Sequence, residues 1–457
     1  MAYQILKLFR SANEIRRAMD LLGLLDWLKK LDPEWRRSLT AVEKKAIKNQ
    51  FGYKCRICGS KNNQELAHIK PREEGGINHP SNIVLLCSHK KEPLGCHELY
   101  DRGFLARKKL RELIKTPSLS LKCRKKMLHD YDVARENDSF SRPLPKGVDF
   151  PSDIEGAAYL WRRGDACKEL RTKIKGSKRD KDLKSEFFNR LYLAELLRRS
   201  PSNLELEKAW KQILRCNELL KHVDLPYLSR FYYEYGYIIH LLGYPAKAID
   251  AYRKSVEIAH NTCDEWTTNE DFIAEAQKMV VEMLSLQKWG SEAWSDLQPI
   301  DQRFRSMENK MQRVTKPAIR NRWTVSIYLH LANLHIKAKK VKTAKEFFSK
   351  AEKLRDSIDA RTGWWATGHE LSKTEFLISV LERSEFGHHN DKLKKCNRAL
   401  HNMMSPRAKR PEGIKDVLFA LGYLLNNEHE FEKARKIKSI ADRTYDPFSG
   451  LFSSDFF

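Results

Sequence analysis

The stretch CRICGSKNNQELAHIKPREEGGINHPSNIVLLCSHKKEPLGCHELYDRG, residues 55–103, carries the pattern that decides the fold of the N-terminal part of this chain. Three side chains mark it: His68 in AHIKP, Asn82 in SNIVLLC and His97 in CHELYDRG. Histidine and amide groups at this spacing, interleaved with thiols, indicate metal-dependent chemistry. The interleaved cysteines are Cys55, Cys58, Cys87 and Cys96.

The same stretch predicts a small unit in the order strand, loop, strand and helix. Residues 65–70 and 82–86 have strand character, the second through its Ile-Val-Leu-Leu run, and Gly, Asn and Pro between them favour a turn. From His97 onward, leucines recur at helical spacing. We therefore expect His68 to face His97 across this unit, with Asn82 bracing the connection.

These residue types suit phosphodiester hydrolysis. That reaction needs a base that activates water, a cation that neutralises developing charge, and groups that hold both in line. Histidine can be a neutral base near physiological pH or a metal ligand. A lone histidine would be read as an ordinary loop residue, but three motif strings in order favour a nuclease site.

The stretch resembles the HNH endonuclease family, whose core is a ββα-metal hairpin, and the AHIKP, SNIVLLC and CHELYDRG strings carry the resemblance. The resemblance implies that His68 is the general base, that Asn82 orients the loop and that His97 binds a catalytic Mg²⁺ or Mn²⁺. Asp101 is then a second ligand or a carboxylate that orients a histidine. Ala67 departs from the family pattern, because many members place a metal-binding Asp or His there. Either Asp101 or another carboxylate completes the metal shell, or His68 is itself a ligand.

The cysteines form two candidate pairs for a structural zinc ion: Cys55 with Cys58, and Cys87 with Cys96. Four thiolates would make a closed tetrahedral site, and His89 is a candidate substitute for one of them. The alternative is four buried thiols in a reducing compartment. The other cysteines are scattered and have the pattern of free thiols: Cys123, Cys167, Cys216, Cys263 and Cys396.

The chain is strongly basic, with 85 Lys and Arg against 60 Asp and Glu in 457 residues and a net charge of +25. The first 150 residues hold 31 basic and 18 acidic side chains, so the excess is densest around the motif. Nucleic acid, with DNA favoured, is therefore the first expected partner.

The densest basic stretch, 102–126, follows the motif directly. A helix there would present cations to a phosphate backbone, although the usual fate of such a run is a solvated helix face. The residues expected to contact nucleic acid are Arg102, Arg107, Lys108, Lys109, Arg111, Lys122, Arg124, Lys125 and Lys126.

The sequence predicts a cytoplasmic protein with no membrane partner. The N-terminus is charged and amphipathic, unlike a secretory leader, and no apolar run is long enough for a membrane span. Unpaired cysteines suit a reducing compartment.

Composition divides the chain into five parts. Residues 1–50 are expected to form helices that either wrap the nuclease unit or dock to another subunit. The nuclease domain with its basic extension occupies 51–136, and the Pro-rich stretch 137–154 is predicted to be a linker. A helical domain follows at 155–445. The aromatic tail at 446–457 is expected either to pack onto that domain or to dock to a partner.

Within the helical domain, small and aromatic residues recur at similar spacing in 231–259, 328–354 and 417–441. These segments resemble tetratricopeptide repeats, with 185–222 and 364–402 as degenerate copies. Such repeats bind proteins or peptides and have no chemistry of their own. The expected fold is therefore mostly α, with a small zinc-stapled ββα-metal nuclease domain followed by a helical-repeat solenoid.

Together these features favour a metal-dependent HNH endonuclease that is controlled or targeted by a protein or peptide bound to its repeats. Bacterial antiphage defence is a setting, by analogy, in which this pairing makes sense. A homo-oligomer would place two single-strand-cutting sites on one duplex. One rival is a non-catalytic zinc-containing nucleic-acid-binding adaptor with a protein-docking repeat domain, which Ala67 supports. A second rival is a scaffold whose positive charge contacts an acidic partner.

Overall fold

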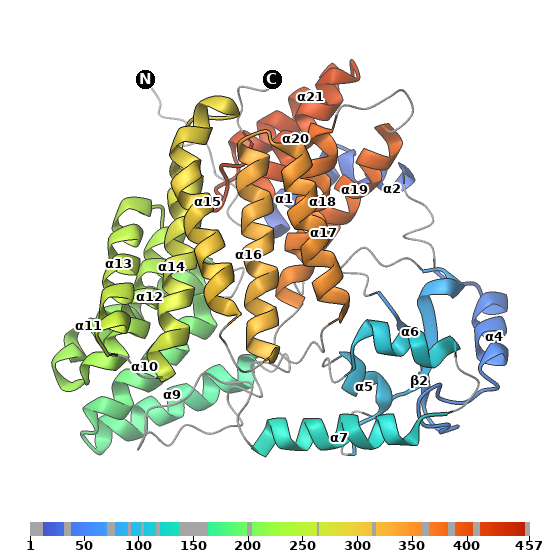
Figure 1. Ribbon diagram of the computed structural model, residues 1–457, viewed down its shortest axis with the longest axis horizontal. Helices are drawn as coiled ribbons and strands as arrows, with labels where there is room; N and C mark the ends of the chain where they lie inside the picture. The colour runs from blue at the N-terminus through green and yellow to red at the C-terminus, as the bar shows by residue number, and fades with distance from the viewer. Residues whose placement is uncertain are drawn as a thin grey trace.

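The computed structural model describes residues 12–31, 38–70, 78–89, 93–101, 105–115, 119–136, 163–198, 203–262, 265–312, 317–357, 365–382, 389–404 and 412–452. This part of the chain forms a small ββα unit with basic helices and a long array of paired helices (Figure 1), which confirms the predicted fold class. None of the described helices combines the length and the apolar character needed to span a bilayer. The predicted linker 137–154, Arg102 and Cys263 lie outside the described residues.

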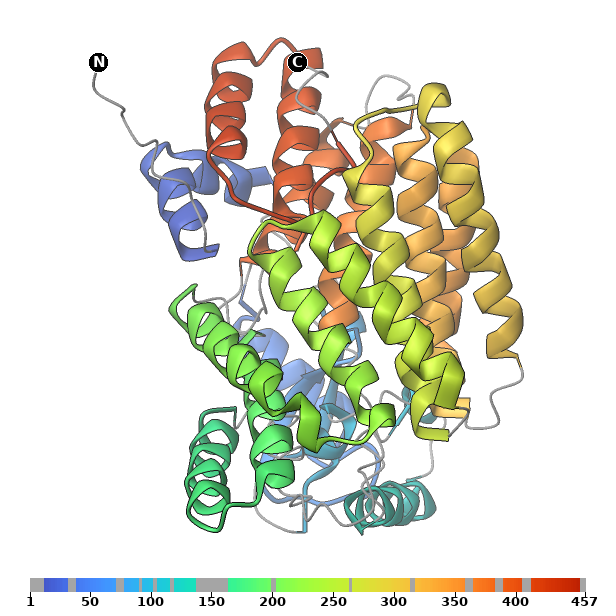
Figure 2. The ribbon, with the colours of Figure 1, turned by 90° about the vertical axis from the view of Figure 1, so that its left-hand side faces the viewer.

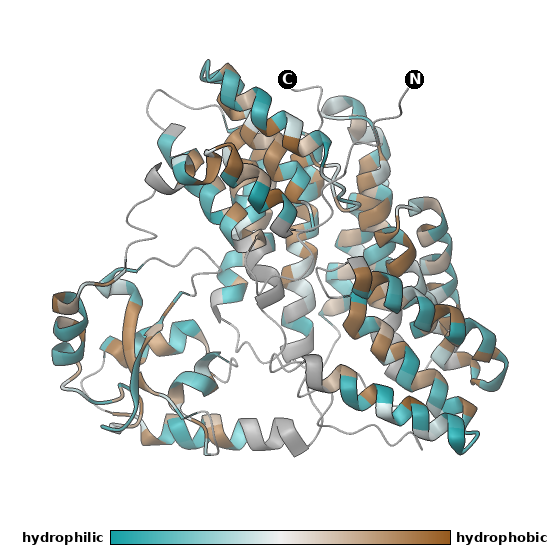
Figure 3. Ribbon diagram, turned by 180° about the vertical axis from the view of Figure 1, so that it is seen from behind, coloured by the Kyte–Doolittle hydropathy of each residue, from teal (hydrophilic) through white to brown (hydrophobic). Residues whose placement is uncertain are grey.

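An antiparallel hairpin forms the centre of the small unit. Strand β1 spans Gln64–His68 and strand β2 spans Ile83–Cys87, with Leu66 paired to Leu85 in the middle. β2 is buried along its whole length, because α5 (Cys96–Asp101) and α4 (Ala41–Gln50) both pack against it, and it stands out as hydrophobic in Figure 3. A single turn of 3-10 helix, η2 (Pro80–Asn82), leads into β2. The predicted order of strand, loop, strand and helix is correct.

Two basic helices complete the small unit. They are α6 (Arg107–Lys115) and α7 (Leu121–Glu136). Leu110 and Leu113 of α6 and Met127 of α7 are buried in the same core as the hairpin. This apolar docking leaves most of the lysines of both helices exposed.

The helical array contains six successive helix pairs within the described residues, preceded by α9 (Arg163–Arg179). The first three pairs are α10 (Leu183–Arg198) with α11 (Asn203–Leu219), α12 (Leu225–Leu241) with α13 (Pro245–Thr262), and α14 (Glu265–Ser285) with α15 (Ser291–Met311). The short η3 (Leu220–His222) joins the first pair to the second. The last three pairs are α16 (Pro317–Lys337) with α17 (Val341–Ser357), α18 (Trp365–Leu381) with α19 (His389–Met403), and α20 (Ile414–Asn427) with α21 (Phe431–Asp442).

The pairs stack into a solenoid (Figure 2). The first helix of each pair packs on the first helix of the next, from α10 to α20, and each second helix also contacts the following pair. Small residues permit this close packing. A Cβ on Gly236 of α12 would lie 3.0 Å from the ring of Tyr252 in α13. The pair α14 and α15 is one that the sequence patterns did not single out.

The two N-terminal helices occupy a place that the sequence did not reveal. α1 (Ala12–Leu21) and α2 (Leu24–Leu31) pack against α21 and α19 at the far end of the solenoid (Figure 1). The expectation that residues 1–50 wrap the nuclease unit is therefore wrong for α1 and α2. It is correct for α4, which begins with a capping box formed by Thr40 and Glu43. The last apolar face of a solenoid needs a cap, and five side chains of α1 and α2 join its core: Ile15, Met19, Leu24, Leu25 and Leu28.

The aromatic tail belongs to the solenoid core as far as the structure describes it. Phe448 is buried with the helices of the first pairs, and Phe452 is buried with those of the later pairs. This placement decides between the two expectations for the tail in favour of packing, while residues 453–457 lie outside the described part. Asp416 holds the segment, because its Oδ1 accepts hydrogen bonds from three consecutive backbone N–H groups: Gly450, Leu451 and Phe452.

Candidate functional site

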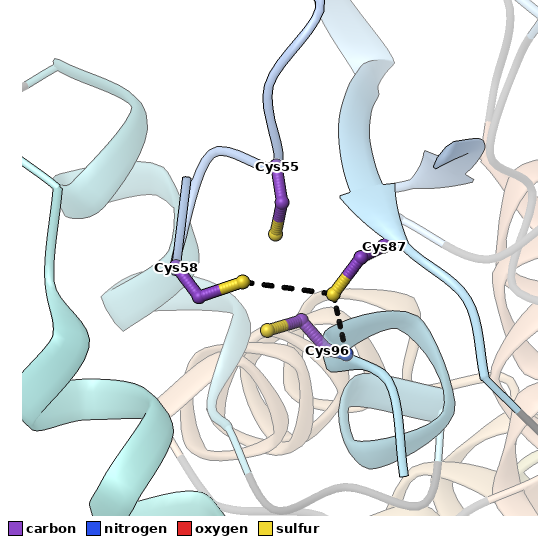
Figure 4. Close-up of side chains that lie close together, drawn as sticks. All are labelled: Cys55, Cys58, Cys87 and Cys96. Atoms are coloured by element: carbon purple, nitrogen blue, oxygen red, sulfur yellow. Dashed lines mark hydrogen bonds between the residues drawn. The ribbon is translucent and has the colours of Figure 1, made fainter. Parts of the chain in front are cut away.

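Four cysteines converge from three segments of the small unit (Figure 4). Cys55 and Cys58 lie in the turn before β1, Cys87 ends β2, and Cys96 begins α5. Their Sγ atoms all lie within 4.8 Å of one another, and those of Cys58 and Cys87 are 3.6 Å apart. Sulfur atoms around a tetrahedral zinc ion are separated by about 3.8 Å, given Zn–S bonds of about 2.3 Å. The donor set therefore fits one zinc ion.

The turn that carries the first two cysteines is tightly closed. The backbone N–H of Cys55 donates to the carbonyl of Ser60 at 2.8 Å, and that of Gly59 donates to the carbonyl of Cys55 at 2.9 Å. Gly59 adopts a φ of +78°, a backbone conformation that favours glycine. His89, considered as a substitute ligand, places its Nδ1 3.5 Å from Nδ2 of Asn63 and is not among the clustered ligands.

Close contact among the thiols separates their pKa values. A hydrogen bond with Cys55 is the main cause of the pKa shift of both Cys58 and Cys96. It lowers the pKa of Cys58 and raises the pKa of Cys96. Like-charged neighbours cannot all ionise easily at such distances. A divalent cation at the centre would allow the four thiols to ionise together.

His97 lies between two carboxylates. Its Nδ1 is 3.0 Å from Oε2 of Glu65 on β1, and its Nε2 is 3.4 Å from Oδ2 of Asp101, one turn further along α5. The His97 side chain is 18% exposed, whereas those of Glu65 and Asp101 are 52% and 64% exposed. Because the carboxylates lie on opposite ring nitrogens, one can orient the imidazole while the other lies beside the nitrogen that faces away from it.

His68 and Asn82 have separate partners in the hairpin loop. Nε2 of His68 is 2.7 Å from Oδ1 of Asn78. Asn82 forms two hydrogen bonds with the backbone of Lys70: its Oδ1 accepts from the N–H at 2.8 Å, and its Nδ2 donates to the carbonyl at 3.0 Å. These bonds close the base of the loop, which is the geometry that a loop-bracing residue needs.

The strand residue against His97 differs from the one expected. Side chains alternate along a strand with a period of two, so Glu65 shares the α5 face of β1 with the buried Ala67. The expectation that His68 faces His97 is therefore corrected in favour of Glu65. Sequence reasoning missed Glu65, although an acidic residue two positions before Ala67 on a half-buried strand was a usable signal.

Residues 55–92 match the family model described as HNH endonuclease. The match includes His68, Asn82 and the first three cysteines and ends before Cys96 and His97. Residues 229–262 and 325–357 match the tetratricopeptide repeat model, which corresponds to α12 with α13 and α16 with α17. The chain thus joins an HNH endonuclease domain to tetratricopeptide repeats, as the sequence motifs predicted. Neither a curated protein nor a solved structure matches the chain.

The cationic residues around the HNH domain divide into two groups. Arg107 is only 5% exposed, and Arg124 directs Nη1 at Sγ of Cys96 from 3.1 Å, so neither is placed as an open phosphate ligand. Both arginines depart from the expectation for a physical reason: Arg107 is buried at the start of α6, and the guanidinium of Arg124 is attracted to the thiols. The other residues of α6 and α7 that were expected to contact nucleic acid keep at least partial exposure: Lys108, Lys109, Arg111, Lys122, Lys125 and Lys126.

Proposed function

We propose that this protein is a metal-dependent endonuclease that hydrolyses phosphodiester bonds in nucleic acid, with DNA as the favoured substrate, and that its repeat domain controls or targets the reaction. The observation that carries the proposal is the position of His97. In α5, just beyond residues 55–92 of the HNH match, it lies between Asp101 of the same helix and Glu65 of β1, the strand that also carries His68.

His68 is the proposed general base. When Nε2–H donates to Oδ1 of Asn78, the neutral imidazole carries its lone pair on Nδ1, which can accept a proton from the attacking water. The same hydrogen bond fixes the orientation of the ring. General-base assistance of this kind typically contributes about 10²- to 10⁴-fold in rate.

His97 and Asp101 are the proposed ligands of the catalytic Mg²⁺ or Mn²⁺. An imidazole and a carboxylate from one face of α5 suit a hard cation that keeps several water ligands, and Ala67 adds no donor. The bound cation would neutralise charge that develops on the phosphate. Glu65 accepts from Nδ1–H of His97 and thereby leaves Nε2 as the metal-binding nitrogen.

A structural zinc ion is proposed for the cysteine centre. Cys55, Cys58, Cys87 and Cys96 would hold the turn, the end of β2 and the start of α5 together. The site is separate in its residues from the proposed catalytic pair. Its metal would therefore contribute to folding and not to the chemistry of cleavage.

The proposed nucleic-acid surface consists of the exposed cations of α6 and α7. Because α6 and α7 pack into the same core as α5, they can hold a phosphate backbone beside the catalytic residues. The residues assigned to this surface are Lys108, Lys109, Arg111, Lys122, Lys125 and Lys126.

The repeats are proposed to bind a regulatory protein or peptide in the cytoplasm. An unregulated nuclease endangers its own cell, so a partner that licenses cleavage is expected, and bacterial antiphage defence is the biological setting that we propose. Contacts between α6 of the HNH domain and α17 of the solenoid give such a partner a physical route to the nuclease.

The test is plasmid nicking with chelated protein to which Mg²⁺ or Mn²⁺ is returned. His68→Ala should lower the nicking rate at least about 100-fold while binding to the plasmid is retained. His129→Ala is the matched control, because His129 is an exposed histidine of α7. Full activity of His68→Ala would contradict the proposed mechanism. Plasmid binding without nicking by the wild type, with every metal, would instead favour the zinc-containing adaptor that Ala67 suggests.

A further inference from the structure

We propose that Arg124 is the charge partner of the cysteine centre and that it couples zinc binding to the placement of the basic helix α7. Nη1 of Arg124 lies 3.1 Å from Sγ of Cys96 and 3.7 Å from Sγ of Cys87. Nη2 of the same guanidinium donates to the carbonyl of Leu94 at 3.2 Å. This inference rests on the zinc centre of the proposed function and adds a positioning residue to it.

Both basic helices are attached to the turn that carries the first two cysteines. Nη2 of Arg56, inside that turn, donates to the carbonyl of Leu113 in α6 at 2.5 Å. The backbone N–H of Ser120, just before α7, donates to the carbonyl of Ile57 at 2.9 Å. The cysteine turn is therefore the common anchor of the helices that carry the proposed nucleic-acid surface.

Charge explains why an arginine occupies this place. Four thiolates around one divalent cation leave an excess of negative charge, and a partly buried cation beside them offsets it. The planar guanidinium can donate to two sulfur atoms and to a carbonyl at once, whereas an ammonium group lacks this fork. Outer partners of metal ligands typically change metal affinity about 10- to 100-fold when they are removed.

Few apolar contacts hold the first part of α7, residues 121–130. Among these residues Met127 is the one fully buried apolar side chain, and Cys123 and Leu128 are partly buried. Arg124 lies on the same side as these residues, while Lys125 is exposed. Without the contact between Arg124 and the thiols, α7 should separate more easily from the hairpin and carry its lysines away from the proposed substrate path.

The experiment compares full-length Arg124→Gln, Arg124→Lys and Lys125→Gln with the wild type. Lys125→Gln is the matched control, because it removes one positive charge from the adjacent position of the same helix. The measurements are zinc content, zinc affinity in competition with a chelator, limited proteolysis with a protease that does not select basic residues, and binding to a DNA duplex across salt concentrations.

Arg124→Gln should lower zinc affinity about 10- to 100-fold and make α7 more susceptible to the protease. Arg124→Lys should change zinc affinity and protease susceptibility in the same direction, but less. Arg124→Gln should also weaken DNA binding more than Lys125→Gln, although Lys125 is the more exposed cation. Equal zinc affinity in Arg124→Gln and Lys125→Gln would overturn the inference and leave the zinc centre standing. If Arg124→Gln is insoluble, zinc affinity of Arg124→Lys that equals the wild type would overturn it. Wild-type protein without zinc would refute the centre itself, while nicking by the same protein tests the nuclease proposal separately.

Discussion

Replacement of Glu65 by alanine should raise the concentration of Mg²⁺ or Mn²⁺ that the nuclease needs without removing its catalytic base. Glu65 contacts Nδ1 of His97 at 3.0 Å and does not lie beside Nε2, the proposed metal-binding nitrogen. Without its acceptor, the imidazole of His97 can rotate or carry its proton on the wrong nitrogen. The loss should therefore appear as weaker metal binding.

The magnitude follows from the exposure of the pair. A hydrogen bond to a charged group contributes about 1.5–3 kcal/mol when it is shielded, and an exposed ion pair contributes less than about 1 kcal/mol. The Glu65 side chain is 52% exposed and that of His97 is 18% exposed, so we take a value of roughly 1 kcal/mol. That corresponds to about a fivefold increase in the half-saturating metal concentration.

The assay is the initial rate of plasmid nicking across a metal titration. Glu65→Ala should shift the midpoint about fivefold and change the maximal rate less than about twofold, and Glu65→Gln, which keeps an acceptor oxygen, should shift it less. Glu112→Ala is the control, because Glu112 is an exposed carboxylate that pairs with Lys109 in α6. A large fall in maximal rate at an unchanged midpoint would refute the orienting role of Glu65.

Four further outcomes are expected. Purified protein should contain about one zinc ion per chain, and Cys96→Ser should lower zinc content and solubility together, as metal analysis would show. A fragment of residues 38–136 should be soluble with zinc, whereas a fragment that also retains α1 and α2 should aggregate because their apolar faces lose the solenoid; size-exclusion chromatography distinguishes these results. The pKa of Asp446 is raised to about 6, first by burial and then by Asp416. The protonated carboxyl group therefore stabilises the folded state at low pH, and this contribution is lost as pH rises through about 6. Between about pH 5 and about pH 7.5, the free energy of unfolding of Asp446→Asn should rise by about 1 kcal/mol relative to that of the wild type, as chemical unfolding would measure. A variant with glutamate at five positions of the proposed nucleic-acid surface should bind DNA more weakly; the positions are Lys108, Lys109, Arg111, Lys125 and Lys126. In a plot of log affinity against log salt concentration, its slope should be shallower by about 0.9 for each lost phosphate contact. An unchanged slope would contradict this.

Local spacing was enough to predict the strands and the helix of the small unit and most of the helix pairs of the solenoid, although not the pair α14 and α15. The Ile-Val-Leu-Leu run, the turn formers before it and the leucines after His97 predicted two strands and a helix, because each depends on neighbours in sequence. Small residues such as Gly236 and Ala248 predicted paired helices, since only a small side chain permits their close contact. The convergence of the four cysteines was also predictable, because the hairpin brings its two ends together.

Contacts between distant segments depended on the tertiary structure. The amphipathic pattern of α1 and α2 predicts that each helix packs against an apolar surface, but it does not identify that surface. In the structure the partners are α21 for α1 and α19 for α2. Sequence reasoning did not predict that folding would place Glu65 3.0 Å from Nδ1 of His97, or that Arg124, expected to contact nucleic acid, would lie 3.1 Å from Sγ of Cys96. The sequence by itself thus determined most of the elements that form and the family that the small unit matches, because both depend on short-range patterns. Only the tertiary structure decided which charged groups meet, because such pairs are selected by the packing of the whole chain.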